Sequence, residues 1–397
     1  MTKIYTSQFL IFSVIFGFYL GPLRSDQILI LMFGSWALLN LFKSDQAITP
    51  REIFVILLIV FFNVIGVLSF IFNESQNFSL LVLAQLENYL SLGAIFLIWL
   101  FYFKNENLSQ LIKAQKTFIF VMCLVTTLNL LSWALGPQVL SIFHIAEIGP
   151  ERPELQGIIL LELLQNSGRY PGTFGQIFEA GTAYFLALLS SLVLRKFYFS
   201  RVLWAVSSLF LVLGGFLTGS KIFILGSAVL ILYYTFKFSK LFFPFLLMLS
   251  TILTMVAVYG DSLPWQFSRL INNVTFENIF NVYTSARFAE GSAIVSGMKN
   301  IFEQSPIVGM GFGYLSTSDF SLYEVLAVSG TIGVIIYILT ILLMYFDSSS
   351  TKDVMRTLMI IIFIFTISIA APAVTANKIG FLLLTCLLSL KRICRET

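Results

Sequence analysis

A row of apolar segments, each close to the length that crosses a lipid bilayer, constrains this chain most. A membrane-spanning helix needs about 20 predominantly apolar residues, and segments such as 53–72, 79–103 and 321–346 satisfy that requirement. Hydrophobic residues occupy 58% of the 397 positions and charged residues only 11%. Because a soluble domain could not cover so much apolar surface, the sequence predicts an all-α polytopic integral membrane protein.

The apolar segments predict twelve transmembrane helices within a single integral membrane domain, residues 1–397. The expected spans are 5–23, 27–42, 53–72, 79–103, 117–135, 178–194, 202–218, 222–236, 241–259, 321–346, 355–371 and 374–390. Segments 178–194 and 222–236 are short, so a tilted or partly re-entrant helix is an alternative there. The first segment lacks an Ala-x-Ala-like exit, which favours an uncleaved span over a signal peptide.

The loops between these segments differ in their content of lysine and arginine. Short loops such as 43–52, 104–116 and 195–201 are rich in basic residues, and such loops stay on the cytoplasmic side. This asymmetry predicts that both termini are cytoplasmic and that the long loops 136–178 and 260–320 face outward. No convincing internal repeat is visible, which counts against a secondary transporter.

The small number of cysteine and histidine residues excludes several kinds of site. Cys123, Cys386 and Cys394 lie in predicted spans or at the inner C-terminus, where no disulfide is expected. The lone histidine, His144, is expected to be structural or exposed, and a Cys/His metal site is excluded in practice. The net charge of +4 does not suggest a nucleic-acid partner. We therefore expect no metal and no cofactor.

The first outward loop carries an arginine in a glycine-rich setting. An apolar run at 156–164 is too short to span the membrane, and it predicts an interfacial or re-entrant helix that ends at Gly168. Arg169 would then emerge at the membrane surface, where its planar fork suits phosphate. Gly172 and Gly175 would shape the loop by letting the backbone approach a ligand. The alternative is that Arg169 only reaches toward lipid headgroups.

The second outward loop carries another arginine, Arg287. Residues 285–304 are expected to form a helix on which Arg287 and Glu290 share a face. This arginine is a second candidate phosphate ligand, and an exposed ion pair with Glu290 is the alternative. Lys299 and Glu303 are expected to form a solvated pair on the same helix.

Other glycine-rich or ionisable positions lie at the outer ends of the spans. The turn Gly309–Gly313 resembles half of a nucleotide-binding fingerprint, but it follows no strand, so we expect a tight turn at the membrane surface. Lys221 and Glu179 open predicted spans. Asp319 and Glu324 flank the entry to the span at 321–346 and are candidate bases.

In their order and spacing, these segments resemble the O-antigen polymerase/ligase family of polytopic glycosyltransferases. The resemblance covers about residues 165–346. Its segments are Arg169–Gly175, similar to the family's Arg-x-x-Gly-Thr-Phe-Gly; Leu217–Lys221, similar to Leu-Thr-x-Ser-Arg; Arg287; Ser305–Gly313; and Leu322–Gly333. Lys221 departs from the usual arginine. The histidine typical of the ligase branch is absent near Asp319, which favours the polymerase branch.

The resemblance implies a GT-C-like membrane glycosyltransferase in a bacterial inner membrane, with its active site toward the periplasm. Donor and acceptor would be undecaprenyl-diphosphate-linked oligosaccharides, and a chain-length regulator protein would be a further partner. Arg169, Arg287 and Lys221 would bind the diphosphate. Asp319, and second Glu290, would accept the proton of the acceptor hydroxyl.

Two other functions remain open at the level of the sequence. An O-antigen ligase would join finished polymer to a different acceptor. A flippase or transporter of lipid-linked oligosaccharides would have charged or broken spans near the middle of the membrane, and the sequence shows few of them.

Overall fold

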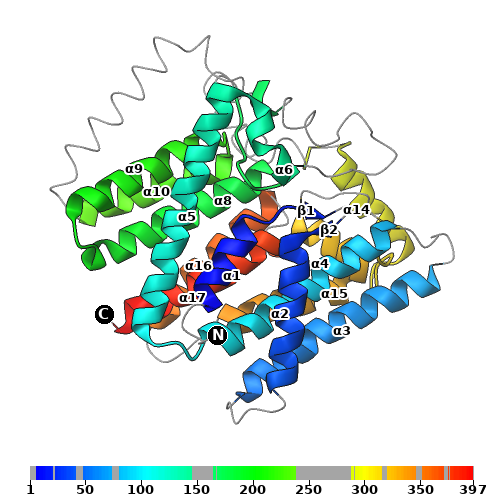
Figure 1. Cartoon of the computed structure of the whole chain (residues 1–397). Coiled ribbons are helices and arrows are strands. Elements are labelled where there is room, and N and C mark those ends of the chain that lie inside the picture. The colour runs from blue at the N-terminus through cyan, green and yellow to red at the C-terminus, as the bar shows by residue number, and fades with distance from the viewer. Residues whose placement is uncertain are drawn as a thin grey trace. The chain divides into compact units, whose positions relative to one another are not determined.

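Helices make up almost all of the regular structure among the described residues (Figure 1). The computed structural model describes residues 6–20, 23–41, 48–73, 80–144, 164–166, 168–237, 288–289, 291–314, 320–345, 351–370, 374 and 376–396. Within these residues the only strands are β1 (Tyr19–Leu20) and β2 (Leu23–Arg24), which pair antiparallel with Tyr19 opposite Arg24. The predicted all-α class is therefore confirmed for the described part of the chain, apart from this short pair.

The chain divides into two compact units, and the first comprises residues 1–14, 25–114 and 284–397. Its most extensive helix packing joins α3 to α15 and α2 to α4. Its elements are α1 (Thr6–Ile15), α2 (Ser25–Leu41), α3 (Pro50–Phe72), α4 (Leu80–Ile98), which continues as the π-helix η2 (Trp99–Phe103), the start of α5 (Leu108–Leu135), α14 (Ala293–Gln304), α15 (Ser321–Tyr345), α16 (Thr351–Ala370) and α17 (Asn377–Glu396).

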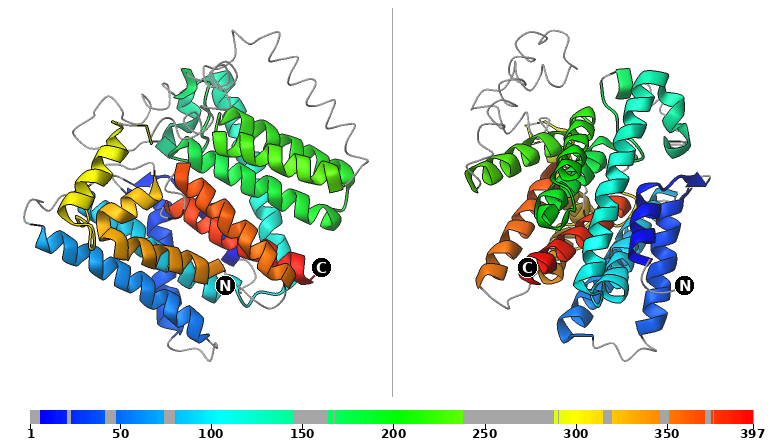
Figure 2. Two further views of the ribbon diagram at one scale, coloured as in Figure 1. Left: turned by 180° about the vertical axis from the view of Figure 1, so that it is seen from behind. Right: turned by 60° about the vertical axis from the view of Figure 1, so that its left-hand side comes forward.

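The second unit comprises residues 15–24 and 115–283. Its helices α8, α9 and α10 run side by side (Figure 2). Glycines allow this close packing, because a Cβ on Gly181 would overlap Ser220 and one on Gly215 would overlap the ring of Phe223. The elements of the unit are the rest of α5, η3 (Pro137–Leu140), α6 (Ser141–His144), α8 (Ile177–Val193), η5 (Leu194–Phe197), α9 (Arg201–Leu217) and α10 (Lys221–Lys237).

Every predicted span except 241–259, which lies outside the described residues, contains a helix. Among the described residues, five helices are long and apolar enough to cross a membrane. They are Pro50–Phe72, Gln85–Phe103, Leu108–Leu135, Ile177–Phe197 and Ser321–Tyr345. A membrane protein is therefore well supported, while the count of twelve spans and the position of the termini stay predictions.

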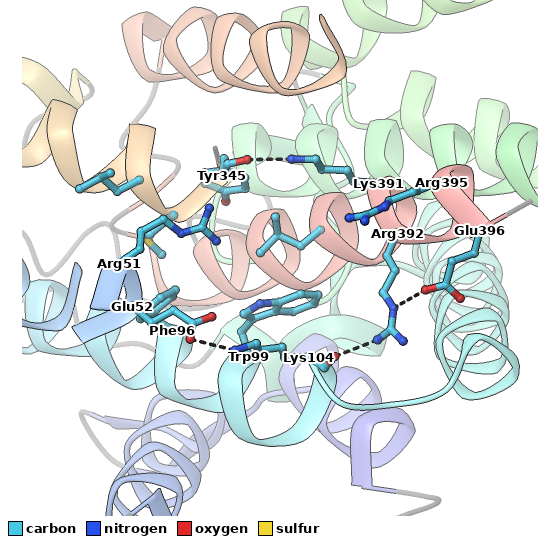
Figure 3. Close-up of a pocket in the computed structure, with 13 residues that line it drawn as sticks. Arg51, Glu52, Phe96, Trp99, Lys104, Tyr345, Lys391, Arg392, Arg395 and Glu396 are labelled. Carbon is cyan, nitrogen blue, oxygen red and sulfur yellow. Dashed lines mark hydrogen bonds and ion pairs between the residues drawn. The ribbon is translucent and has the colours of Figure 1, made fainter. Parts of the chain in front are cut away.

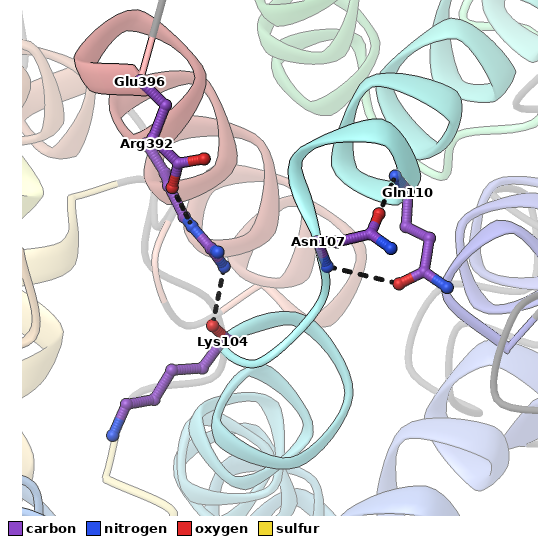
Figure 4. A network of polar contacts seen from close by, with 5 residues as sticks. All are labelled: Lys104, Asn107, Gln110, Arg392 and Glu396. Carbon is purple, nitrogen blue, oxygen red and sulfur yellow. Dashed lines mark hydrogen bonds and ion pairs between the residues drawn. The ribbon is translucent and has the colours of Figure 1, made fainter.

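Local capping explains where several helices begin. At α3 the Thr49 side chain accepts from the Glu52 backbone N–H at 3.3 Å, and Glu52 Oε2 accepts from the Thr49 N–H at 2.9 Å. At α5 Asn107 and Gln110 exchange the same two bonds, at 2.9 and 3.3 Å (Figure 4). Because of this cap, α5 begins at Leu108, well before the predicted residue 117.

Two further predicted boundaries are wrong. The helix expected over 5–23 ends at Ile15, and the strand pair follows; glycine and proline at 17, 21 and 22 disfavour a continued helix. The helix expected over 285–304 begins only at Ala293, because Gly291 has a φ of 78° and the Ser292 hydroxyl accepts from the Val295 N–H at 3.3 Å.

A break inside α15 is the feature of the first unit that the sequence did not predict. Gly330 has a φ of 61° and a ψ of −160°, so the helical path is interrupted within an apolar segment long enough to span a membrane. The break frees backbone groups that must find partners within the protein. Residues 306–311 supply these partners, as described below.

Candidate functional site

The loop that carries Arg169 begins with a helix end of a defined type. The Gly168 N–H donates to the Gln165 carbonyl at 2.8 Å, and the Arg169 N–H donates to the Leu164 carbonyl at 2.9 Å. Gly168 has a φ of 72°, so the two bonds form a Schellman cap with glycine in its left-handed position. The predicted helix end at Gly168 is confirmed; residues 156–163 of the expected helix lie outside the described residues.

The same loop is fixed to the end of α9 in the second unit. The Tyr170 N–H donates to the Leu217 carbonyl at 2.8 Å. Leu217 is followed by Gly219, with a φ of 63°, and by Lys221, the first residue of α10. Two segments of the family resemblance, Arg169–Gly175 and Leu217–Lys221, therefore lie together, although about 40 residues separate them in the sequence.

Gly172 and Gly175 contribute in different ways. Gly172 has a φ of 69°, and a Cβ there would overlap Val125 and come within 3.3 Å of the Asn129 Oδ1. Here a left-handed backbone and close packing both require glycine. Gly175 has an ordinary φ, and its N–H donates to the Glu179 Oε2 at 3.1 Å. Both residues fix the course of the loop, and their predicted role in letting the backbone approach a ligand stays a prediction.

Glu179 holds the loop against the start of α8. It is buried, it accepts from the backbone N–H groups of Gly175 and Gln176, and it lies 4.0 Å from the Arg24 Nη1. A carboxylate that is engaged in this way at a helix N-terminus stabilises the local fold. We therefore assign Glu179 a positioning role.

The side chain of Arg169 carries a hydrogen-bond donor that finds no acceptor among the described residues. Its side chain is half-buried, and its Nε is buried without a hydrogen-bond partner among the described residues. Burial lowers the pKa of the Arg169 guanidinium from its ordinary value, although a guanidinium stays protonated in proteins. A buried donor without an acceptor is costly, and an anionic ligand would remove that cost.

Beneath the loop lies a polar group that sequence reasoning missed. Asn129 of α5 is fully buried, and its Nδ2 donates to the Tyr184 hydroxyl at 3.5 Å. Its Oδ1 has no hydrogen-bond partner among the described residues. The available signal was an asparagine in the middle of an otherwise apolar predicted span.

The predicted site residues fall into three groups. Arg169, Gly172, Gly175 and the segment that ends at Lys221 come together in the second unit, and Lys221 is half-buried. Glu324 is buried in the first turn of α15 in the first unit. The proposed Arg287, Glu290 and Asp319 lie outside the described residues.

Two further segments of the resemblance are bound to each other in the first unit, at the break in α15. Residues 306–311 run across the break in α15. They form hydrogen bonds with backbone groups of the helix on both sides of Gly330. The Thr331 and Ile332 N–H groups donate to the Pro306 and Ile307 carbonyls at 3.0 and 3.2 Å. The Met310 and Gly311 N–H groups donate to the Ala327 and Val328 carbonyls at 2.7 and 3.2 Å.

The glycine-rich turn at 309–313 is therefore a turn, as predicted, but its glycines pack inside the unit. Gly309, Gly311 and Gly313 all have positive φ, and the first two are buried. α3 also holds the turn, because the Asn73 Nδ2 donates to the Met310 carbonyl at 2.9 Å. The expectation of a turn at the membrane surface did not anticipate this packing against α3 and α15.

The break at Gly330 corrects the expectation of few broken spans in the first unit. Glu324 and Lys378 are buried, but both lie in the first turns of their helices, α15 and α17, at the ends of predicted spans. Glu87 of α4 accepts from the Gln27 Nε2 at 3.1 Å and from the Asn377 Nδ2 at 2.8 Å. Polar groups are thus paired across helices inside the unit, where hydrophobicity alone would favour apolar side chains.

Comparison with known proteins finds no match: no protein-family model, no curated protein and no solved structure is similar to this chain. Within the described residues no group of three or more His, Cys, Asp or Glu side chains could hold a metal ion. The function must therefore be argued from the residues and their geometry.

Proposed function

We propose that this protein is a membrane glycosyltransferase that polymerises undecaprenyl-diphosphate-linked oligosaccharide units. The growing chain would pass from its lipid diphosphate to a sugar hydroxyl of an incoming lipid-linked unit. The observation that carries the proposal is Arg169, whose buried Nε has no hydrogen-bond partner among the described residues. It stands on a loop fixed by glycine, Glu179 and the end of α9.

In this transfer the leaving diphosphate needs cations that stabilise its charge more than it needs an acid that protonates it. When the diphosphate leaves the anomeric carbon, negative charge develops on its oxygens, and preorganised donors that face this charge lower the barrier. Arg169 and Arg287 would supply them, with Lys221 as a third cation. The proton of the attacking hydroxyl would pass to Asp319 or, as second choice, to Glu290. No step of this scheme requires a metal.

Support for the polymerase also comes from the pairing of the resembling segments. Arg169–Gly175 is bonded to Leu217 in the second unit, and 306–311 is bonded to 327–332 in the first. Backbone hydrogen bonds thus hold each pair within its own unit, which supports a fixed geometry for the residues that each pair carries. An outward-facing site at a bacterial inner membrane remains part of the proposal.

A second candidate function follows from the broken helix. Discontinuous helices and buried charges are common where transporters bind their substrates, and α15 with Gly330, Glu324 and the nearby turn has both features. A flippase of lipid-linked oligosaccharides is therefore the main rival. An O-antigen ligase is the third candidate.

The surface polysaccharide of a deletion strain separates the three. For a polymerase we expect a product limited to a single repeat unit, and restored long chains when the gene is returned. Gel profiles of the extracted polysaccharide would show this directly. Absence of any product would indicate a flippase, and long polymer that stays unattached would indicate a ligase.

A further inference from the structure

A cavity of about 420 Å³ lies in the first unit, and its lining includes none of the residues assigned to sugar transfer. It forms where the start of α3, the end of η2 and the ends of α15 and α17 meet (Figure 3). The lining residues are Arg51, Glu52, Phe96, Trp99, Lys104, Leu343, Met344, Tyr345, Leu388, Lys391, Arg392, Arg395 and Glu396.

The charged residues of the lining are mostly basic: five are Lys or Arg and two are Glu. Both acids are already engaged. The Lys104 Nζ lies 2.8 Å from the Glu52 Oε2, and the Arg392 Nε lies 2.7 Å from the Glu396 Oε1. The pocket therefore keeps an excess of positive charge.

The basic side chains are held in place by the fold. The Arg392 Nη1 donates to the Lys104 carbonyl at 2.8 Å, which ties α17 to the end of η2 (Figure 4). Lys391 is buried, and its Nζ donates to the Tyr345 carbonyl at 3.2 Å and to the Thr357 Oγ1 at 2.7 Å. Because these hydrogen bonds hold the Lys391 ammonium in place, its positive charge is already positioned for an anion.

The remaining wall is apolar, and it continues onto a surface suited to lipid. Phe96, Trp99 and Leu388 are among the apolar residues that line the cavity. Outside it, α3 exposes Phe54, at 50%, about one turn from Arg51 on the same side of the helix. Since α3 is apolar and long enough to span a membrane, Arg51 at its start would stand at the depth of the headgroups.

We propose that this pocket binds the headgroup of an anionic glycerophospholipid. The phosphate sits among Arg51, Lys391 and Arg395, and the acyl chains follow the exposed face of α3. A small soluble phosphate would share the charge but would leave the apolar wall unused. Basic pockets between helix ends are a general means of holding anionic lipids, and the proposal stands independently of the sugar-transfer function.

The test compares ligands on the full-length protein in a neutral detergent. Phosphatidylglycerol, phosphatidylcholine and inorganic phosphate are titrated separately, while the unfolding temperature and the lipid retained in native mass spectra are measured. We expect phosphatidylglycerol to raise the unfolding temperature and to remain bound. Equal effects of phosphatidylcholine, or an effect of inorganic phosphate as large as that of the lipid, would overturn the proposal.

Variants of the basic residues test whether phosphatidylglycerol binds in this pocket. The double variant Arg51→Gln, Arg395→Gln should weaken phosphatidylglycerol binding about tenfold or more, since two charge-assisted contacts are lost. Both side chains are exposed, so the fold is retained, and the single variant Arg395→Gln repeats the test with a smaller change. Arg201→Gln removes an exposed charge at the start of α9 and should change nothing. Unaltered lipid affinity in the double variant would refute the site.

Discussion

Replacing Arg169 with alanine should leave the protein abundant in the membrane and stop the formation of long-chain polysaccharide. The loop does not depend on this side chain, because backbone bonds from Gly168, Arg169 and Tyr170 hold it. The lost cation would no longer stabilise the departing diphosphate, and loss of one preorganised donor costs about two to three orders of magnitude in rate. Immunoblots of membranes and gels of the polysaccharide measure both effects.

Arg169→Lys is the matched control for this prediction. Lysine keeps the charge but loses the planar fork that binds phosphate through two parallel bonds, so we expect a partial loss of chain length. Full activity of the lysine variant would indicate simple electrostatics or headgroup anchoring instead. Normal chain length in the alanine variant would remove Arg169 from the mechanism. The proposal makes the same prediction for Arg287→Ala.

Replacing Gly309 with alanine should destabilise the protein severely. Gly309 has a φ of 74°, and an added Cβ would stand 2.5 Å from the Gly330 nitrogen and 2.8 Å from the Ala327 carbonyl oxygen. Both neighbours are backbone atoms that cannot rotate away, and the overlap would push 306–311 out of the break in α15. We expect a loss of about 3 kcal/mol or more, from backbone strain and overpacking together.

Gly291→Ala separates the two causes. Gly291 also has a positive φ, 78°, but a Cβ there meets nothing within 4 Å. Only the conformational penalty remains, which is roughly 1 kcal/mol. Thermal unfolding of the two purified variants in the same detergent gives the comparison. If Gly309→Ala is no less stable than Gly291→Ala, the packing described at the helix break is incorrect.

The sequence predicts best those features that depend on residues close to one another in the chain. The helix end at Gly168 follows from one glycine after an apolar run, and the helical segments follow from runs of apolar residues. The early start of α5 was also local, in the Asn107–Gln110 cap, but an apolar window does not detect a polar first turn.

What the sequence does not reveal depends on distant segments. The break at Gly330 is stable because residues 306–311 satisfy its backbone, and no local pattern distinguishes it from an ordinary glycine in a span. The basic pocket gathers residues from positions 51 to 396. Of the site, the Arg169 loop could be predicted with its glycines, whereas Asn129 and the pairing with Leu217 required the fold.

The most direct test of the proposed activity is elongation by the purified protein alone. The full chain is reconstituted in vesicles with undecaprenyl-diphosphate-linked repeat units, and product length and released undecaprenyl diphosphate are measured together. The account predicts chains of many units, with one lipid diphosphate released for each bond formed, and no elongation by Arg169→Ala. Single units that cross the vesicle membrane without being joined would contradict it and identify a flippase.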